Sequence, residues 1–509
     1  TLPKLLHVLE DEGLEKRKME LLEKEGSGCR VLLEQEKHDD LARMFRMFSR
    51  LTAGLEPMAV IFEEHIVKLG TEIFEARAAR LEADAAAAGA KGGDKDINND
   101  PQFIKDLLNL HEKYLEITSK YFQNKPLFQK ALESSFSKIM NSIEGKGSVP
   151  DLLSSFCDRI LKKGEKLNEA ETENFLERVV KLFMYLQDKD MFGEIFRNQL
   201  AKRLLNEKSN SDELERSMIG KLKIACGAQF TAKLEGMMND LAIGKDHQKK
   251  YDERKQREDL KHLPDFGVQI LTQGHWPTYK SILPKLPSRM SECVKSFQDF
   301  YLSVDENGKR RLIWQYTLGT ASVRMTIKKD GKSKVYDFDV HTMQAAALEI
   351  FNTTPGPISI GDLVVLLGLE EPVIMKIVHS LVCGKYKILK KSGSGTSDSK
   401  GIKPSDSFEI NSSFSSPMRK MKLIMSSLED SHNPKRIEED RGHAIEACIV
   451  RTMKSRKTLA HQPLVAEVLN QLTLFKPDPK TVKKHIASLI ERDFLERAEN
   501  NSTVYNYLA

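Results

Sequence analysis

Hydrophobic side chains in the first half of the chain recur at intervals of three and four residues, which is the spacing of amphipathic helices. Residues 1–140 are predicted to form a helical stalk on this basis. After a turn-rich joint the same spacing continues, and it predicts a helical bundle over residues 141–260. Asp188 or Asp190 is placed to cap one helix of this bundle.

The hydrophobic period then changes from that of helices to that of strands. Arg311–Leu318 is apolar and strand-like, and both Ser322–Ile327 and Lys334–Val340 alternate with period two. Asp330-Gly331 supplies a turn between the last two segments. The pattern predicts a small antiparallel meander within an α/β region at residues 261–340.

The order helix, helix, helix, strand pair then occurs twice, which is typical of winged-helix domains. The first copy is assigned to residues 341–415, with the Ser- and Gly-rich stretch 391–403 as its wing or a loop. The second copy is assigned to residues 416–509 and begins with a long helix from about Ile437 to Lys457. The predicted fold class is mainly α with a small α/β part.

Composition excludes some classes of protein. A chain of 509 residues, 40% hydrophobic and 30% charged, is too long for one core and too apolar for wholesale disorder. Its six cysteines are widely spaced, so we expect reduced thiols in a protein of the cytoplasm and nucleus. No apolar stretch has the length of a membrane span, and the net charge of +5 does not imply a nucleic-acid partner. Because the chain begins with Thr1, we expect it to be a fragment.

A search for catalytic motifs finds no active site. The HExxH, GxSxG and GxxxxGK[ST] patterns are absent, and Gly393 and Gly395 lack the strand–helix frame of a phosphate-binding loop. The 13 histidines are scattered, and none pairs with cysteine at the spacing of metal ligands. The acidic run Glu438–Asp440 lies at a helix start, where the helix dipole favours it. We therefore predict a protein that is not an enzyme.

The third helix of the second winged helix is basic, which raises the alternative of a nucleic-acid-binding protein. This helix carries Lys480, Lys483, Lys484 and His485, and the third helix of a winged helix can enter the DNA major groove. The same lysines suit an ordinary solvated face. The helix has no Arg, Asn or Gln placed for bidentate contacts to bases, so we favour protein–protein use.

A basic segment near the end of the long helix stands out as a candidate site. On a helix of about 100° per residue, Lys454 falls opposite an apolar stripe and should be the most exposed residue of its turn. Arg451 and Lys457 flank it three residues away on either side. Taken alone, this arrangement is better explained as an ordinary solvated face, because exposed lysines with basic neighbours are common. The predicted buried stripe consists of Ile445, Cys448, Ile449, Thr452 and Met453.

The segment Ile449–Lys457, and the sequence from there to Ala509, closely resembles the C-terminal neddylation domain of the cullin family. Asp188–Phe192 and Cys226–Met237 resemble the helices of that family's bundle, and Leu312–Trp314 resembles its α/β region. The resemblance covers nearly the whole chain and is nearest to the cullin-1 type.

Two features depart from the family pattern. Thr452 stands where the family usually has a bulky apolar residue. The first residues match a late part of the stalk, so residues 1–140 would be the last cullin repeat. The earlier repeats, which bind adaptors in the family, are expected to be missing.

The resemblance implies a non-catalytic scaffold of a multisubunit cullin-RING ubiquitin ligase. A RING-box subunit would bind the α/β region, by adding a strand near Arg311–Leu318, and would recruit a ubiquitin-conjugating enzyme. No cofactor is implied for this chain, because zinc would belong to the RING subunit alone. An adaptor and substrate receptor would bind through the missing N-terminal region. The residues implied in RING-subunit binding are Leu312, Ile313, Trp314 and Tyr316.

The resemblance also implies that Lys454 forms an isopeptide bond with a Nedd8-type modifier, which dedicated machinery attaches and removes. In the family this modification frees the last winged helix, which is a population shift between two arrangements. The implied context of the modified lysine is Ile449, Val450, Arg451, Met453, Arg456 and Lys457.

Overall fold

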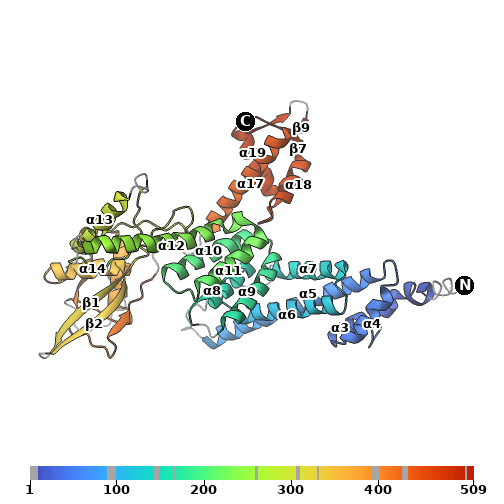
Figure 1. The fold of residues 1–509 in the computed structure, drawn as a ribbon, viewed down its shortest axis with the longest axis horizontal. Helices are drawn as coiled ribbons and strands as arrows, with labels where there is room; N and C mark the ends of the chain where they lie inside the picture. The colour runs from blue at the N-terminus through green and yellow to red at the C-terminus, as the bar shows by residue number, and fades with distance from the viewer. Residues whose placement is uncertain are drawn as a thin grey trace. The chain divides into compact units, whose positions relative to one another are not determined.

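The structure is a computed structural model, and its helices and strands are labelled in Figure 1. The chain divides into two compact units, one of Thr1–Glu235 with Pro434–Ala509 and the other of Gly236–Asn433. Helices dominate and the sheets are small, as the sequence predicts. The residues described are 10–88, 99–142, 148–164, 167–257, 262–304, 310–329, 332–392, 402–426, 434–498 and 501–508.

The first unit begins with helices that pack through an aromatic core. The rings of Phe122 and Phe128 stack with centroids 4.0 Å apart, and Phe62 meets each of them edge-on. Asp100 caps α6 by accepting a hydrogen bond from the Phe103 amide at 3.1 Å. The elements are η1 (Asp11–Glu15), α2 (Lys18–Leu22), α3 (Cys29–Glu34), α4 (His38–Phe48), α5 (Leu55–Ala88), α6 (Pro101–Lys120) and α7 (Pro126–Met140).

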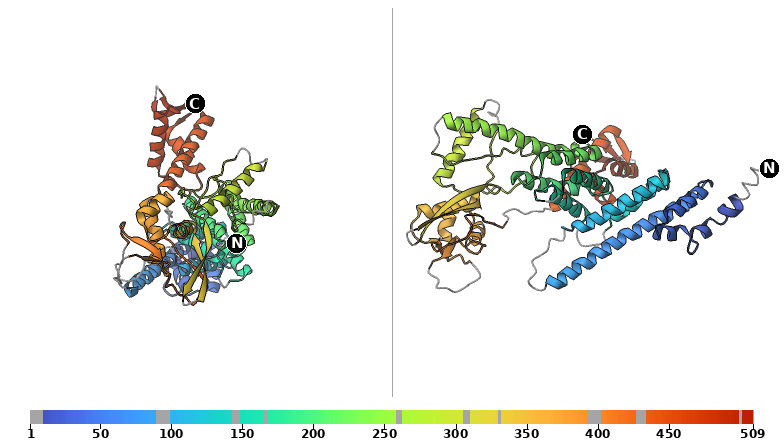
Figure 2. Two further views of the ribbon diagram at one scale, coloured as in Figure 1. Left: turned by 90° about the vertical axis from the view of Figure 1, so that its left-hand side faces the viewer. Right: turned by 60° about the horizontal axis from the view of Figure 1, so that its bottom comes forward.

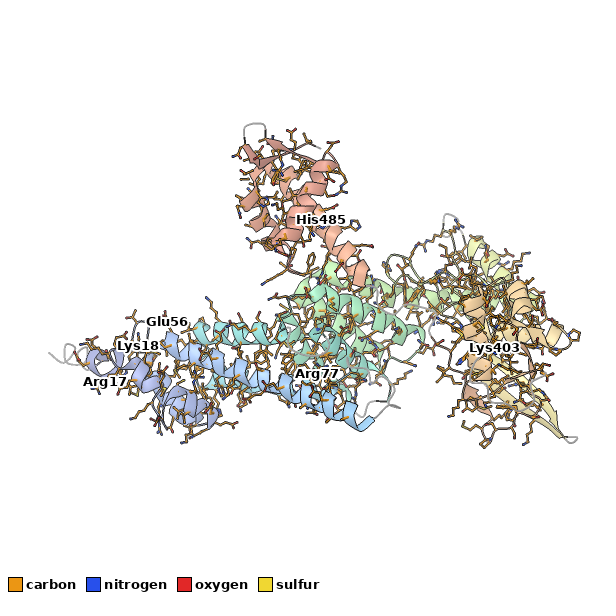
Figure 3. The ribbon with its side chains drawn as sticks, turned by 180° about the vertical axis from the view of Figure 1, so that it is seen from behind. Arg17, Lys18, Glu56, Arg77, Lys403 and His485 are labelled. Carbon is orange, nitrogen blue, oxygen red and sulfur yellow. The ribbon has the colours of Figure 1, made fainter. Side chains whose placement is uncertain are left out.

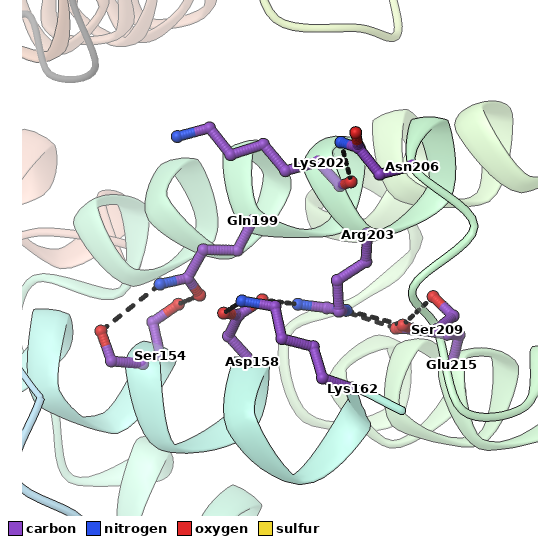
Figure 4. A network of polar contacts seen from close by, with 10 residues as sticks. Ser154, Asp158, Lys162, Gln199, Lys202, Arg203, Asn206, Ser209 and Glu215 are labelled. Carbon is purple, nitrogen blue, oxygen red and sulfur yellow. Dashed lines mark hydrogen bonds and ion pairs between the residues drawn. The ribbon is translucent and has the colours of Figure 1, made fainter. Parts of the chain in front are cut away.

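The bundle helices are joined by a fully buried ion pair. Arg203 of α10 and Glu215 of α11 form a bidentate pair at 2.7 and 2.9 Å, and both side chains are 0% exposed. Asp158 of α8 accepts a third bond from Arg203 at 2.7 Å (Figure 4). Such a pair keeps its charges only where hydrogen bonds replace the lost water, so it fixes how these three helices meet. The bundle comprises α8 (Val149–Leu161), α9 (Glu169–Met184), α10 (Lys189–Leu205), α11 (Asp212–Cys226) and α12 (Ala228–Arg257).

The second unit contains a three-stranded sheet of order β1-β2-β6. β1 (Thr320–Lys329) and β2 (Lys332–His341) are antiparallel, as predicted, although the Asp330-Gly331 turn lies outside the described residues. β6 (Lys420–Lys422) runs parallel to β2. The sequence predicts these residues as part of the last winged helix, within 416–509. That assignment is wrong, because buried Met421 pairs with Phe338 and joins the core of this sheet.

The predicted strand Arg311–Leu318 is also wrong. Its residues form irregular backbone followed by a turn, after α13 (Ser288–Ser303). Its apolar side chains serve a different purpose, since Leu312 and Trp314 pack against a buried aromatic cluster on α12 and α13. The apolar residues of this segment therefore pack on a hydrophobic cluster and do not form a strand of the sheet. The buried cluster is Tyr251, Phe297, Phe300 and Tyr301.

A winged helix follows in the second unit, and its sheet has the order β3-β5-β4. It has the predicted three helices, but its first wing strand begins at Leu389, later than the predicted Tyr386. Residues 393–401 of the expected wing lie outside the described residues. The elements are α14 (Thr342–Thr353), β3 (Ile358–Ser359), α15 (Ile360–Leu367), α16 (Glu371–Val382), β4 (Leu389–Lys391) and β5 (Ser407–Ile410).

The last winged helix belongs to the first unit and is drawn in red in Figures 1 and 2. Its three helices and two final strands are those predicted, and a further strand, β7, pairs with β9. Its sheet order is β7-β9-β8. The elements are α17 (Pro434–Arg456), β7 (Thr458–Ala460), α18 (His461–Gln471), α19 (Pro479–Glu491), β8 (Leu495–Ala498) and β9 (Asn501–Tyr507).

Candidate functional site

Lys454 lies exposed in the last turn of α17, opposite a buried stripe. The geometric prediction for this helix is confirmed, because all five stripe residues are buried. Ile445, Cys448, Ile449 and Met453 pack into a core that α17 shares with α18, α19, β8 and β9. Among the described residues, none forms an ion pair with Lys454. The exposed fractions are 2% for Ile445 and Thr452 and 0% for Cys448, Ile449 and Met453.

Lys457 ends the helix just after Lys454. Its φ of +66° is left-handed, which a residue with a side chain adopts at a cost of about 1 kcal/mol. The cost is offset locally, since the Lys457 amide donates to the Met453 carbonyl at 2.7 Å and its carbonyl accepts from the Tyr507 amide at 2.9 Å. Its ammonium also lies 5.2 Å from the centre of the Tyr507 ring. The turn that carries Lys454 is therefore held by the final strand.

The other residues expected around Lys454 divide between core and surface. Ile449 and Met453 are buried and Val450 is half-buried, while Arg451, Arg456 and Lys457 are exposed. Arg456 lies 3.5 Å from Glu467 of α18. The structure thus places Lys454 on a basic surface that rests on an apolar core.

Thr452, the departure from the family pattern, has a polar partner. Gln471 at the end of α18 donates from its amide nitrogen to the Thr452 hydroxyl at 3.2 Å. The Gln471 oxygen accepts from the Cys448 thiol at 3.4 Å. Burial raises the pKa of that thiol, which keeps it neutral and able to donate. The sequence alone does not single out Gln471, because its only sign there is a polar residue at the end of a helix with apolar positions.

The base of α17 is joined to the bundle through Arg441. Its guanidinium donates to Asp190 at 2.5 and 2.7 Å and to Asp188 at 2.8 Å. The hydrogen bonds that Arg441 donates to Asp190, and the charges of both acids, raise the pKa of Arg441. Asp188 does occupy the N-cap position of α10, but no cap bond from its side chain is found in the described residues. The predicted cap is instead half of an ion-pair cluster.

The loop between α18 and α19 completes this joint. The Leu474 carbonyl accepts from the amides of Lys189 at 2.9 Å and Asp190 at 3.2 Å. These are amides of the first turn of α10, which have no partner inside the helix. The Phe475 ring lies 5.0 Å beneath the Arg441 guanidinium. The last winged helix is therefore docked on the bundle by charge and backbone contacts, and Phe475 packs against Arg441 from within the winged helix.

The residues implied in RING-subunit binding lie on the irregular segment before β1. Ile313 is 56% exposed, whereas Leu312, Trp314 and Tyr316 are half-buried. The rings of Trp314 and Tyr316 stack at 6.2 Å with planes 9° apart. The indole nitrogen of Trp314 and the side-chain oxygen of Gln315 are buried without a hydrogen-bond partner among the described residues. In the same part of the chain β1 pairs with β2 alone, which leaves one edge of β1 open.

The lysines of α19 are exposed, as both nucleic-acid binding and protein–protein binding would require. Lys480, Lys483 and Lys484 face solvent, while His485 (Figure 3) hydrogen-bonds to Glu446 of α17 at 3.0 Å. Burial alone would raise the pKa of Glu446, but the bonds from Arg492 and His485 outweigh it and lower that pKa. His485 is therefore part of the helix packing and is not free to read bases.

Two classes of site are not found in the part of the chain that the structure describes. It contains no group of three or more His, Cys, Asp or Glu side chains able to hold a metal ion. Across the same ranges, no helix combines the length and the apolar character of a membrane span. The candidate chemistry therefore rests on Lys454 and on the surfaces for partners.

Three family models match the chain, in the order that its elements suggest. They are a cullin alpha solenoid domain over residues 1–248, a cullin alpha+beta domain over 270–414 and a cullin protein neddylation domain over 440–501. Lys454 lies within the last of these matches.

Individual relatives match along almost the whole chain. Cullin-1 of Oryza sativa subsp. japonica is 42% identical over 513 residues, which is 99% of this chain and 67% of the relative. Cullin-2 of Arabidopsis thaliana is 39% identical over 516 residues, 100% of this chain and 67% of the relative. Cullin-3A of Arabidopsis thaliana is 35% identical over 516 residues, 99% of this chain and 66% of the relative. The chain thus spans about two thirds of the length of these relatives.

Proposed function

The chain belongs to the cullin family, and from this premise we propose that it is a non-catalytic scaffold of a cullin-RING ubiquitin ligase. We propose further that a Nedd8-type modifier joined to Lys454 activates it. The observation that carries this proposal is the exposure of Lys454 in the last turn of α17, inside the neddylation-domain match.

The chemistry required of Lys454 is that of a nucleophile. Its ammonium loses a proton, and the free amine attacks the carbonyl of the thioester that links the modifier to its conjugating enzyme. The C–S bond breaks and the thiolate leaves, while the attacking nitrogen gives up a second proton to the thiolate or to water, so that an isopeptide bond forms at Nζ. An exposed lysine on a helix held from below, by the core under Met453 and by the Lys457–Tyr507 bond, suits this reaction.

The proposed surface for the RING-box subunit is the open edge of β1 together with the segment before it. An extended segment of a partner can add to such an edge through main-chain hydrogen bonds. Ile313, in the segment before β1, is exposed and offers an apolar contact. The zinc of the assembly would lie in that subunit, so this chain would need no cofactor.

The remaining proposed partners follow from the same scaffold role. The RING subunit would recruit a ubiquitin-conjugating enzyme, and an adaptor with its substrate receptor would bind a region preceding this chain. The modifier would be attached and removed by its own enzymes. We place this activity in the cytoplasm and nucleus.

Replacing Lys454 by Arg tests the central assignment. The full chain with a RING-box subunit is incubated with the charged modifier system, and the conjugate is measured by its shift in mass. We expect K454R to lose essentially all of the conjugate, because the guanidinium of Arg is not nucleophilic at neutral pH. K476R, which changes another exposed lysine of the same domain, should be modified like the wild type. Equal modification of K454R and wild type would remove Lys454 as the acceptor.

A gel-shift experiment separates the scaffold from the nucleic-acid alternative. Binding that is sequence-selective at physiological salt, and is lost when Lys483 and Lys484 become Ala, would favour a winged helix that reads DNA. The scaffold predicts only weak binding that salt abolishes.

A further inference from the structure

The helices α3, α5 and α6 line a polar cavity, the stalk cavity, which the proposed function does not use. Its volume is about 340 Å³. Ligand-binding cavities in proteins measure about 300–1,000 Å³, and one water occupies only about 30 Å³. A single ordered water would therefore leave most of the stalk cavity empty, whereas a small organic molecule fits it.

The buried side of the stalk cavity carries a hydrogen-bonding group without a partner. His65 and Tyr114 both line the cavity and are only 3% and 1% exposed. The Nε2 atom of His65 lies 2.7 Å from the Tyr114 hydroxyl. Its Nδ1 atom is buried and has no hydrogen-bond partner among the described residues. Because an unpaired buried polar group is costly, a ligand atom that bonds to Nδ1 is favoured.

The unpaired nitrogen of His65 is a donor. Burial lowers the pKa of His65, so the ring is neutral and only one of its nitrogens carries a hydrogen. Burial also raises the pKa of Tyr114, so its hydroxyl stays protonated. In the part of the chain that the structure describes, Nε2 of His65 is the acceptor within reach of that hydroxyl. Tyr114 therefore donates to Nε2, and the ring hydrogen is at Nδ1, where it calls for an oxygen acceptor.

Charges of both signs surround the mouth of the stalk cavity. The Lys68 ammonium lies 3.2 Å from Glu34, and the Lys113 ammonium lies 2.6 Å from Glu36. These four side chains are between 39% and 58% exposed, so each pair contributes little and its members can turn to a ligand. Glu72 adds a further exposed carboxylate to the lining. The cavity thus offers ammonium groups and carboxylates together.

We propose that the stalk cavity binds a small zwitterion, a free amino acid with an apolar side chain. Its carboxylate accepts from Nδ1 of His65 and faces the ammonium groups of Lys68 and Lys113. Its ammonium group lies among the carboxylates of the mouth, and its side chain packs on Leu33 and Leu69. A simple anion would meet the carboxylates and a simple cation the ammonium groups. Only a ligand with both charges complements the whole lining.

A second buried pair of the same kind supplies the matched control. His111 is 4% exposed, and its Nε2 atom lies 3.0 Å from the Tyr185 hydroxyl. Unlike His65, it has no buried ring nitrogen without a partner among the described residues. A buried His–Tyr pair is therefore not in itself a site. The unpaired Nδ1 of His65 beside a cavity makes the difference.

The probe for this site is L-valine. Isovalerate lacks the ammonium group of valine and isobutylamine lacks its carboxylate, so each analogue carries one charge. Binding to the full chain is measured by saturation-transfer NMR, and the ring signals of His65, assigned with the His65→Phe variant, locate the bound probe. We expect valine to bind about tenfold or more tightly than either analogue, because each lacks one set of charge-assisted hydrogen bonds.

Two results with the wild-type chain would overturn the proposal. If valine gives no saturation transfer and leaves the His65 signals unchanged, the cavity holds water alone. If isovalerate or isobutylamine binds as tightly as valine, the site does not select a zwitterion.

Variants test which groups bind the probe. His65→Phe keeps a flat ring in the core but removes the Nδ1 donor, so we expect about a tenfold or greater loss of valine binding. His111→Phe should bind valine like the wild type. If H65F does not fold, Glu72→Gln decides, because Glu72 is exposed. E72Q should bind valine severalfold more weakly and isovalerate no more weakly. Wild-type binding of valine by a folded H65F, or by E72Q, would contradict the proposal.

Discussion

The two winged helices share an order of elements but differ in what their cores contain. In the first, Leu363 and Ile377 pack in one core with Phe338 and Met421 of the neighbouring sheet. In the last, the residues of the core all come from its own helices and strands and from the loop between α18 and α19. One copy is thus a fixed part of a larger body, and the other is a self-contained module that carries Lys454. The motif itself does not decide which of these roles it takes.

The largest expected effects come from truncating one residue of each of the two cores. Phe338→Ala is expected to cost about 3–5 kcal/mol and to raise hydrogen exchange both in β1–β2 and in α14–α16, because they share one core. Ile486→Ala is expected to cost about 2–5 kcal/mol and to raise exchange within residues 434–508 and, outside them, only at the α10 amides of Lys189 and Asp190, which donate to the Leu474 carbonyl. Peptide-level exchange in the full chain measures both variants. Spread of the I486A effect to the buried amides of α8, α9 and α11 would show that the last module is not self-contained.

Acidification should affect the first winged helix before the last. His341 caps α14 by accepting from the Met343 amide at 3.3 Å, while its other ring nitrogen donates to the Thr317 carbonyl at 2.5 Å. Burial lowers the pKa of His341, although the Thr317 bond opposes this. The pKa of Glu446 in the last winged helix is also lowered, by its bonds to Arg492 and His485, which outweigh the opposing effect of burial.

The sign follows from comparing folded and unfolded states. The His341 contribution is complete above its unfolded pKa of 6.5 and is lost as pH falls from there toward the lower folded pKa. The Glu446 contribution is lost only below its unfolded pKa of 4.5. Exchange measured between pH 6.5 and 5, corrected for intrinsic rates, should rise first in α14–α16. His341→Asn keeps a cap acceptor and should flatten this response, and an unchanged response would assign it to another group.

The smallest expected effect concerns Thr452, the polar residue in the stripe under Lys454. Thr452→Val removes the hydroxyl that accepts from Gln471. Because Gln471 is exposed, water can replace the lost partner, and we expect a change in unfolding free energy of no more than about 1 kcal/mol. Urea unfolding measures this change. A loss well above 2 kcal/mol would mean that the hydroxyl bonds to more than Gln471.

Local periodicity is sufficient to predict which residues around Lys454 are buried or exposed, but not which distant parts of the chain they or other segments contact. The burial of Ile449 and Met453 and the exposure of Lys454 follow from helical spacing alone, so they could be predicted. Arg311–Leu318 was misjudged because an apolar run looks the same whether it pairs in a sheet or packs on a cluster. The sequence predicts Asp188 or Asp190 as a helix cap and not as an ion-pair partner, because Arg441 lies far away in the sequence and no local pattern indicates it.

The long separation of Arg441 and Asp190 in the sequence also affects the order in which the parts of the protein fold during synthesis. Arg441 and Asp190 are separated by 251 residues, and the first unit is completed only when the chain returns to it at Pro434. During synthesis the bundle can fold while its two aspartates still lack a counter-ion. Closing so long a loop has an entropic cost, but that cost grows only as the logarithm of loop length. The docked arrangement therefore forms late, after the bundle and the last winged helix have each folded. In a nascent chain, Asp188 and Asp190 of the bundle are thus exposed to solvent or to a chaperone.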